Sequence, residues 1–273
     1  LRNDWEGTVK LIFQPGEEKN PGGASLMIKE GVLQNPIPAG IVGLHVHPGL
    51  QVGKLSFRKG RVMASADEIY ITIKGSGGHA ATPHLTVDTI LVAAQLIISL
   101  QQIISRNNNT MNPSILSICS IEGGKTTNVI PAEVKLKGTF RAMDEVWRKK
   151  AHLLIKNQAA GIAIATGAEI DLFIDIGYPT VDNDPIFTEK AWKFADEFMD
   201  KENVLETEVR MGAEDFGYYT QLIPGCFFRL GVRNEEKNII HNVHTPLFNI
   251  DENAIEIGVG NMVWLAINLM SSK

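Results

Sequence analysis

The sequence of 273 residues contains only two cysteines, Cys119 and Cys226, so a framework of several disulfides is excluded, while a single bridge stays open. So few cysteines are typical of a reducing compartment, and we expect a cytoplasmic protein. The chain also begins without methionine and without the apolar segment of a signal peptide. We therefore expect that the natural protein has a further segment before Leu1.

Long apolar runs and clusters of positive charge are missing as well. The longest apolar stretch, residues 90–100, contains Gln95 and Ser99 and is shorter than the about 20 residues of a membrane helix, so it predicts a buried helix and no membrane partner. The formal net charge of -5, without a long basic run, predicts no nucleic-acid partner. The length and the 44% hydrophobic content favour a soluble protein of two domains, or one domain with a large insertion.

The first part of the chain has the pattern of an α/β unit. A β-rich run at residues 8–13 ends at Gln14-Pro15-Gly16, which predicts a strand followed by a loop. Helical spacing follows at residues 24–30, and a second buried strand is predicted at residues 41–46. Strand, helix and strand in this order suggest a parallel arrangement.

The middle of the chain predicts a different architecture. Alternating apolar residues indicate a strand around residues 69–73, and a long apolar helix follows at residues 86–106. Two strands, a helix and a last strand come next, at residues 114–121, 133–141, 145–166 and 169–176. This β-α-β-β-α-β order is the α+β ferredoxin-like plan, over residues 64–177.

The α/β pattern then resumes. Asp184 and Pro185 are typical of the first positions of a helix, here extending to about residue 201. An apolar strand is predicted at residues 226–232, and Asp251 is placed to cap a final helix. We therefore expect one discontinuous domain, residues 1–63 and 178–273, interrupted by an inserted domain at residues 64–177.

Two acidic and two imidazole side chains follow the predicted strands of the first part. Glu17 and Glu18 lie where open α/β sheets place ligands, and neighbours in extended backbone point apart, so one could bind a metal ion while the other faces a metal-bound water. Alone, the pair favours a solvated acidic turn. His45 and His47 share one side of the next strand, and with the glutamates they suggest a Zn²⁺ or Mn²⁺ site, with a surface histidine pair as an equal alternative.

Other polar residues carry weaker signals. His241 and His244 are predicted in a loop before the final helix. Asn128 could donate an amide hydrogen bond and Arg141 could bind a carboxylate through two nitrogens, but isolated residues of these types more often lie on the surface. The glycine-rich residues 75–79 lack the spacing of a dinucleotide-binding loop, and neither a G-x-S-x-G elbow nor a P-loop occurs.

Seven segments in order along the chain resemble the M20 metallopeptidase family, within it the amidohydrolases of N-acyl amino acids, hippurate and auxin (IAA) conjugates. They are QPGEE (14–18), GLHVHP (43–48), GGHAATPH (77–84), TTNVIPAE (126–133), GTFRAMD (138–144), GAEDFGYY (212–219) and HTPLFNIDE (244–252). The resemblance implies a zinc-peptidase-like α/β catalytic domain, interrupted by a ferredoxin-like lid, that hydrolyses the amide bond of N-acyl amino acids with a metal-activated water.

The resemblance also implies roles for single residues. Glu17 would be the general base, and Glu18, His45 and His244 would bind two divalent ions, Zn²⁺ or Mn²⁺. In the lid, His79 would polarise the scissile carbonyl, often from the partner subunit of a homodimer, while Asn128 and Arg141 would orient the substrate. His47 occupies a variable position and receives no role. The lid's edge strand and its apolar helix, residues 86–106, suggest where the dimer forms.

One part of the family pattern is not found. The resemblance implies a His-x-Cys-Gly-His-Asp segment with two further ligands, and no such sequence occurs between Leu1 and Lys273. We therefore expect an N-terminally incomplete catalytic domain holding three of the five implied protein ligands. A family member without catalysis, acting as a dimeric binding protein, is the alternative, and an N-acetyl-diaminopimelate-type deacetylase or a dipeptidase is the alternative in substrate.

Overall fold

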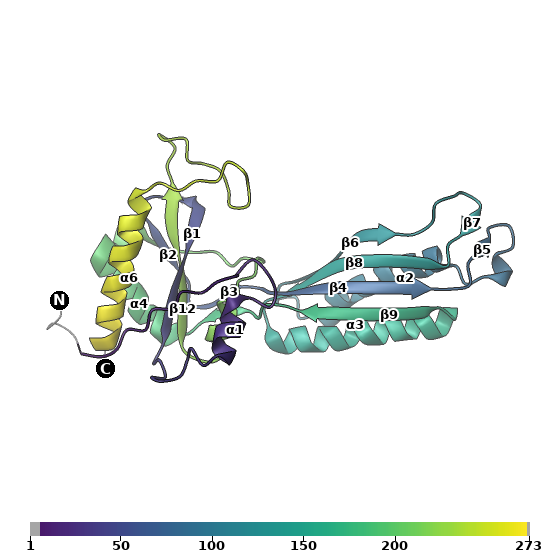
Figure 1. The fold of residues 1–273 in the computed structure, drawn as a ribbon, viewed down its shortest axis with the longest axis horizontal. Helices are drawn as coiled ribbons and strands as arrows, with labels where there is room; N and C mark the ends of the chain where they lie inside the picture. Colours follow the sequence, from purple (N-terminus) through teal and green to yellow (C-terminus); the bar gives the residue numbers. More distant parts are fainter. Residues whose placement is uncertain (1–5, 272–273) are drawn as a thin grey trace. The chain divides into compact units, whose positions relative to one another are not determined.

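Two structural units are built from separate stretches of the chain (Figure 1). The computed structural model describes residues 6–271. The first unit takes in Leu1–Val62, Val181–Arg210 and Asp215–Lys273, and the second takes in Met63–Thr180 and Met211–Glu214. The chain thus leaves the first unit, forms the second and returns.

The first unit is organised on a mixed four-stranded sheet with the order β1-β12-β2-β11. Strand β1 (Ile41–Gln51) runs parallel to β12 (Gly225–Arg233), and β2 (Leu55–Phe57) runs antiparallel to β12 and parallel to β11 (Val204–Glu206). Strand β1 (41–51) thus has a parallel neighbour, as the sequence suggested, but this neighbour is β12 and not residues 8–13. A short pair, β3 (Gly60–Met63) with β10 (Val181–Asn183), lies apart from this sheet.

Two helices cover one face of this sheet. Helix α4 (Pro185–Met199) and helix α6 (Asn253–Ser271) contact each other and β12. The predicted caps are present, since Asp184 accepts from Phe187 N at 2.7 Å and Asp251 accepts from Asn253 N at 3.0 Å. Alternate strand residues enter the core beneath the helices, and they include Val42, Leu44, Val46, Cys226, Phe228, Leu230 and Val232. The intervening strand residues therefore point to the opposite face.

Shorter elements lie on that opposite face. Helix α1 (Gly23–Lys29), which agrees with the predicted helix at 24–30, contacts α5 (Gly217–Thr220), and α5 contacts β12 (Figure 1). Phe216, just before α5, packs above Gly43 of β1. A Cβ atom added to Gly43 would lie 2.6 Å from Cε2 of the Phe216 ring, so only glycine allows this approach.

The predicted strand at residues 8–13 is absent. These residues pair with no strand within the described range 6–271, and the side chains of Leu11 and Phe13 are 72% and 84% exposed. β-propensity alone forms no strand without a neighbouring strand to hydrogen-bond. The segment is instead attached through Lys10, whose Nζ donates to the carbonyls of Val32 at 3.0 Å and Gln34 at 2.6 Å.

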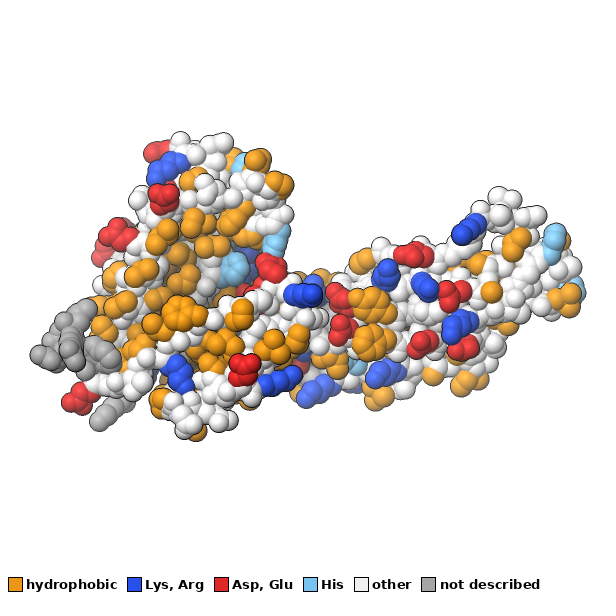
Figure 2. All heavy atoms as spheres, in the orientation of Figure 1, with side chains coloured by type: hydrophobic (Ala, Val, Ile, Leu, Met, Phe, Trp, Pro, Cys, Tyr) orange, Lys and Arg blue, Asp and Glu red, His pale blue; other side chains and the backbone are white. Residues whose placement is uncertain are grey.

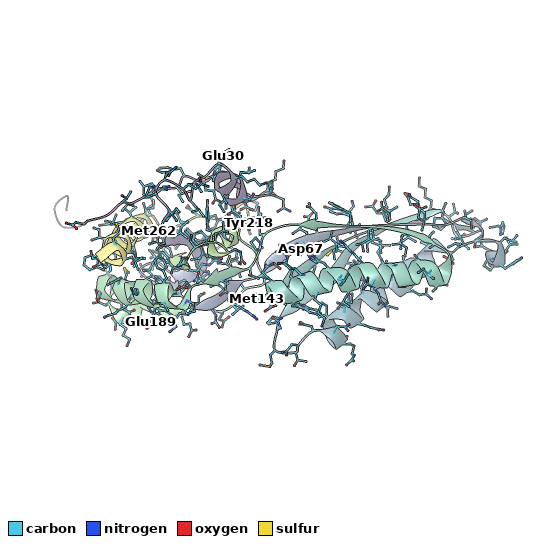
Figure 3. The ribbon with its side chains drawn as sticks, turned by 90° about the horizontal axis from the view of Figure 1, so that it is seen from below. Glu30, Asp67, Met143, Glu189, Tyr218 and Met262 are labelled. Atoms are coloured by element: carbon cyan, nitrogen blue, oxygen red, sulfur yellow. The ribbon has the colours of Figure 1, made fainter. Side chains whose placement is uncertain are left out.

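The second unit has the β-α-β-β-α-β order expected from the sequence. Its antiparallel sheet, in the order β6-β8-β4-β9, consists of β4 (Ser65–Lys74), β6 (Ser114–Glu122), β8 (Glu133–Ala142) and β9 (Glu169–Ile176). Helices α2 (Thr89–Gln102) and α3 (Glu145–Thr166) pack on one face (Figure 3). Ile69, Ile71 and Ile73 of β4 enter the core beneath them.

Several shorter elements complete this unit. Strand β5 (Gly78–His79) pairs with β7 (Val129–Ile130), a 3-10 turn spans Pro83–Leu85, and a π turn, Ile103–Asn107, follows α2. Helix α2 starts at Thr89, three residues later than predicted, because the Asp88 carboxylate accepts from Ile90 N and Leu91 N and so caps it there.

Two helical stretches, Thr89–Asn107 and Asn253–Ser271, are long and apolar enough to cross a membrane by length and composition alone. Core helices of soluble proteins pass the same test. One face of each stretch packs in its unit, through Leu96 and Leu100 of α2 and through Ala254 and Leu265 of α6. The expectation of a buried helix at 90–100 holds for one face, since Leu91 and Ile98 are exposed.

Candidate metal centre

The face of the first sheet opposite α4 and α6 carries His45. The ring lies 6.3 Å from the Phe227 ring of the neighbouring strand, and its Nδ1 is 2.7 Å from the carbonyl oxygen of Val46. Because a carbonyl can only accept, Nδ1 carries the proton of this bond. Burial, more than any other cause, lowers the pKa of His45, which leaves the ring neutral and Nε2 with a free electron pair. That is the form in which imidazole binds a metal ion.

The loop before α1 brings the two predicted glutamates to a third predicted residue. Glu18 Oε1 lies 3.9 Å from His244 Nδ1, and both side chains are largely exposed. The charge of Glu18 also acts on His45, whose pKa it raises against the stronger effect of burial. Of the three predicted ligands, Glu18 and His244 are in contact, and the charge of Glu18 reaches His45. Figure 2 shows imidazole, acidic and basic side chains gathered on this unit.

Glu17 lies in the same group. Burial raises the pKa of its carboxyl most, and the charges of Glu18 and Asp215 raise it further. The charge of His244 and a hydrogen bond from the backbone N–H of Asp215 lower the pKa of Glu17 in part. A half-buried carboxylate with a raised pKa, beside metal-binding residue types, has the properties of a general base.

The donor atoms fit a divalent cation only in part. One carboxylate oxygen and two imidazole nitrogens are ligands that Zn²⁺ and Mn²⁺ accept, and the 3.9 Å between Glu18 and His244 can be spanned by one ion with bonds of about 2.1 Å. Within residues 6–271, however, no group of three or more His, Cys, Asp or Glu side chains is close enough to hold an ion. Among the described residues, the contact between Glu18 and His244 is thus a candidate for part of a metal site.

The His47 side chain has a different hydrogen-bond partner. Arg210 Nη2 lies 2.8 Å from Nε2 and 3.2 Å from Nδ1 of its ring. Burial and the charges of Arg210, Arg229 and His45 lower the pKa of His47 to about 4, so the ring is neutral near pH 7 and accepts from the guanidinium. This contact agrees with the absence of a predicted role for His47 in metal binding.

Two residues of this site were not found from the sequence. Asp215, fully buried, accepts from Gln14 Nε2 at 2.7 and 2.9 Å and from Ala24 N at 3.0 Å. The two residues are Gln14, in the segment QPGEE, and Asp215, in the segment GAEDFGYY. The occurrence of these segments in one chain is the only signal that could have connected them, because local patterns do not report contacts between distant residues.

The remaining predicted site residues belong to the second unit. His79 of β5 pairs with Val129 of β7, and Ala80 N donates to the carbonyl of Asn128 at 3.0 Å, so His79 and Asn128 are neighbours. Arg141 lies near the end of β8, with its Nε 3.3 Å from Thr139 Oγ1. The eight residue-to-residue steps of extended strand from Glu133 to Arg141 cover roughly 27 Å, so Arg141 is not grouped with His79 within this unit.

The chain belongs to the peptidase family M20/M25/M40, whose family model matches residues 1–267. The members of this family are metal-binding hydrolases, and the relatives include enzymes named as amidohydrolases. The N-acetyldiaminopimelate deacetylase of Exiguobacterium sibiricum is 40% identical over 247 residues, covering 90% of this chain and 65% of that protein. The IAA-amino acid hydrolase ILR1-like 4 of Arabidopsis thaliana is 36% identical, covering 93% of this chain and 58% of that protein.

A solved structure agrees with the family and the fold. The YXEP protein of Bacillus subtilis, described as a dinuclear metal binding peptidase of the M20 family, is 30% identical with a TM-score of 0.81. The match covers 100% of this chain and 68% of that one. The chain thus spans about two-thirds of the length of the proteins that it resembles.

Proposed function

We propose that the complete protein hydrolyses the amide bond of N-acyl amino acids, with two divalent ions, Zn²⁺ or Mn²⁺, in each subunit. The observation that carries the proposal is the approach of Glu18 to His244 at 3.9 Å beside Glu17, whose carboxylate is half-buried. The relatives named N-acetyldiaminopimelate deacetylase and IAA-amino acid hydrolase support the substrate class.

The residues of the first unit would divide the chemistry between them. Glu18, His45 and His244 would hold the ions together with ligands from the rest of the protein. When bound, such ions make a water molecule acidic and polarise a carbonyl. Glu17 would take the proton of the attacking water and pass it to the departing amine, for which a raised pKa is suitable.

The residues of the second unit would act on the substrate. His79 would polarise the scissile carbonyl, and Asn128 and Arg141 would orient the substrate, Arg141 through its carboxylate. In this proposal residues 1–63 and 178–273 are the catalytic domain and residues 64–177 are the lid. The separation of Arg141 from His79 within the unit is compatible with two different subunits supplying them.

Homodimerisation through the lid is part of the proposal. Strand β6 is at the edge of its sheet, and α2 exposes Ile90, Leu91 and Ile98. An unpaired strand edge next to an apolar helix face is typical of a self-complementary interface. Sedimentation of the complete protein should show a dimer, and a monomer would contradict this part. We further propose a cytoplasmic protein without nucleic-acid or membrane partners.

A test of the proposed reaction replaces Glu17 by Gln in the complete protein. Hydrolysis of N-acyl amino acids should fall by at least about a thousandfold while metal content stays unchanged, since the amide cannot accept the proton. Glu30→Gln, an exposed carboxylate after α1, is the matched control. Substantial turnover by Glu17→Gln would contradict the role of Glu17.

Specific observations favour alternatives in substrate. The 40% identical deacetylase favours an N-acetyl-diaminopimelate-type substrate, and thermostable carboxypeptidase 1 of Saccharolobus solfataricus, 35% identical, favours a peptide substrate. A panel of acyl and peptide substrates separates them. A non-catalytic dimeric binding protein is the alternative in class, and two tightly bound ions per subunit together with amide hydrolysis would exclude it.

A further inference from the structure

Asp215 connects the two ends of the glutamate loop. Its carboxylate accepts from the side-chain Nε2 of Gln14, three residues before Glu17, at 2.7 Å through Oδ1 and 2.9 Å through Oδ2. Oδ2 also accepts from the backbone N of Ala24, in the first turn of α1, at 3.0 Å. That turn has no side-chain cap from its own N-cap residue, Gly22, so Asp215 supplies the missing acceptor.

The backbone of Asp215 holds the middle of the same loop. Its N–H donates to the carboxylate of Glu17, while its side chain binds Gln14 and Ala24. One residue thus contacts the loop before, at and after the predicted base. A fully buried carboxylate that accepts through both oxygens has a fixed orientation, since each hydrogen bond restricts the other.

Asp215 is itself fixed to the strand that carries His45. The ring of the next residue, Phe216, packs 5.0 Å from Phe227 and 5.7 Å from Tyr219, and it fills the space above Gly43. Gly43 and His45 are two residues apart in β1 and share one face of the sheet. The contacts therefore run from the strand of one predicted ligand to the loop of another.

The loop needs such an anchor because it has few others. The residues before it, 8–13, pair with no strand in the described part of the chain, and Phe13 is exposed. Gly16 has a φ of +68°, and a Cβ added there would meet nothing within 4 Å. Pro15 and Gly23 do approach closely, which fixes the base of the loop but leaves Glu17 and Glu18 to be oriented.

We propose that Asp215 and Gln14 are positioning residues that set the carboxylates of Glu17 and Glu18 relative to His45. The catalytic consequence rests on the proposed amidohydrolase function. The chemistry favours an acid at 215, because its two oxygens accept from N–H donors at once. An asparagine has one acceptor oxygen and no charge, and it keeps a bond to Gln14 only if that amide turns over to accept.

The test moves the acidic side chain from position 215 to position 14. Asp215→Asn removes the charge and one of the two acceptor oxygens, and Gln14→Glu places two acids against each other. The double variant Gln14→Glu/Asp215→Asn pairs an amide donor with an acid acceptor at the parent's net charge. In the complete protein, each single variant should lower kcat by about tenfold or more and change KM by less than about threefold, because orientation is lost and substrate binding is kept. The double variant should recover most of the loss. Asp196→Asn on α4 is the control for loss of a carboxylate elsewhere in the unit.

A second readout does not depend on turnover. Hydrogen exchange of residues 14–24 should accelerate in both single variants and return toward the parent rate in the double variant, and the visible spectrum of the Co²⁺-loaded protein should change with it. Parent-like exchange, spectrum and kcat in both single variants, or effects of the two substitutions that simply add, would overturn the proposal. If the parent cleaves no N-acyl amino acid, the proposed function fails while exchange and spectrum still decide the positioning.

A milder variant covers the case in which Asp215→Asn does not fold. Gln14→Met keeps the length of the side chain and removes its donor, while the bond from Ala24 to Asp215 stays. It should accelerate exchange of residues 14–18 more than that of residues 24–29. Equal exchange in Gln14→Met and the parent would count against the proposal.

Discussion

Asp67 of β4, labelled in Figure 3, forms a buried ion pair with Arg148 of α3 in the second unit, with Nε of the arginine 2.9 Å from Oδ2 of the aspartate. The same carboxylate accepts from His152 Nε2 at 2.7 Å and from Gly177 N at 3.2 Å. Burial would raise the pKa of Asp67, but the hydrogen bonds from His152 and Arg148 outweigh it and lower the pKa below the ordinary value. The pair thus connects a helix, a strand and the end of β9.

A pH dependence of stability follows from this lowered pKa. Asp67 is ionised in the folded protein at pH values where the unfolded chain begins to bind protons, so its contribution is present above the unfolded pKa near 4 and is lost as the pH falls through the lower folded value. Urea unfolding followed by circular dichroism should show stability falling below about pH 4.

Substitution of Asp67 separates this carboxylate from others that titrate in the same range. Asp67→Asn should lower the free energy of unfolding by about 3–5 kcal/mol at pH 7, because Arg148 would remain buried without its partner. It should also make the free energy of unfolding depend less on pH in the acid range. Asp171→Asn, on the exposed side of β9, is the control. A loss below about 1 kcal/mol would show that the pair contributes little.

The two cysteines should differ in reactivity. Cys119 is exposed, whereas Cys226 lies within β12, and burial raises the pKa of its thiol to about 12. Because the thiolate is the reactive form, iodoacetamide at pH 8 should modify Cys119 within minutes and leave Cys226 intact until the protein unfolds. Mass spectrometry of the parent and of Cys119→Ser checks this. Rapid modification of Cys226 in the folded protein would contradict its burial.

Two glycines provide opposite tests of packing. Gly43→Ala would place a Cβ 2.6 Å from the Phe216 ring and should destabilise the protein by about 1–3 kcal/mol. Gly161 lies within α3 and a Cβ there would meet nothing within 4 Å, so Gly161→Ala should stabilise by about 0.5–1 kcal/mol. Urea denaturation measures both. An unchanged stability for Gly43→Ala would contradict the close packing of Phe216 on β1.

The two strand histidines should differ in metal binding. His45→Ala should weaken binding of Zn²⁺ or Mn²⁺ to the complete protein by more than about 10–100-fold, the loss typical of a residue that only hydrogen-bonds to a ligand, since His45→Ala would remove a ligand itself. His47→Ala should change metal binding far less, because the His47 ring is already hydrogen-bonded to Arg210. Metal titration of both variants checks this, and equal losses would give His47 a role in the site that we have not assigned to it.

The second unit was largely predictable from the sequence, and the first was less so. Alternation at Ile69, Ile71 and Ile73 and the long periodic helix at 145–166 are local patterns that report local structure, and these elements formed as expected. Residues 8–13 have the composition of a strand, but composition does not show whether a neighbouring strand is available. The parallel partner of β1 is β12, far along the chain, which no local pattern indicates.

The candidate site shows the same division. Motif order pointed to Glu17, Glu18, His45 and His244. All four lie in the first unit, where Glu18 and His244 are 3.9 Å apart, and their roles stay predictions. The order of the motifs could not indicate that Gln14 binds Asp215, because hydrogen bonds between distant segments depend on the fold. The bond between Arg210 and His47 was missed for the same reason.

The pairing of β1 with β12 has a consequence for how the protein is made. Ile41 lies opposite Gly225, so the central strands of the first unit cannot join until most of the chain has left the ribosome. The four long strands and two long helices of the second unit all fall within residues 65–176 and can assemble earlier. During synthesis, strand β1 therefore stays without its partner strand while the inserted unit folds.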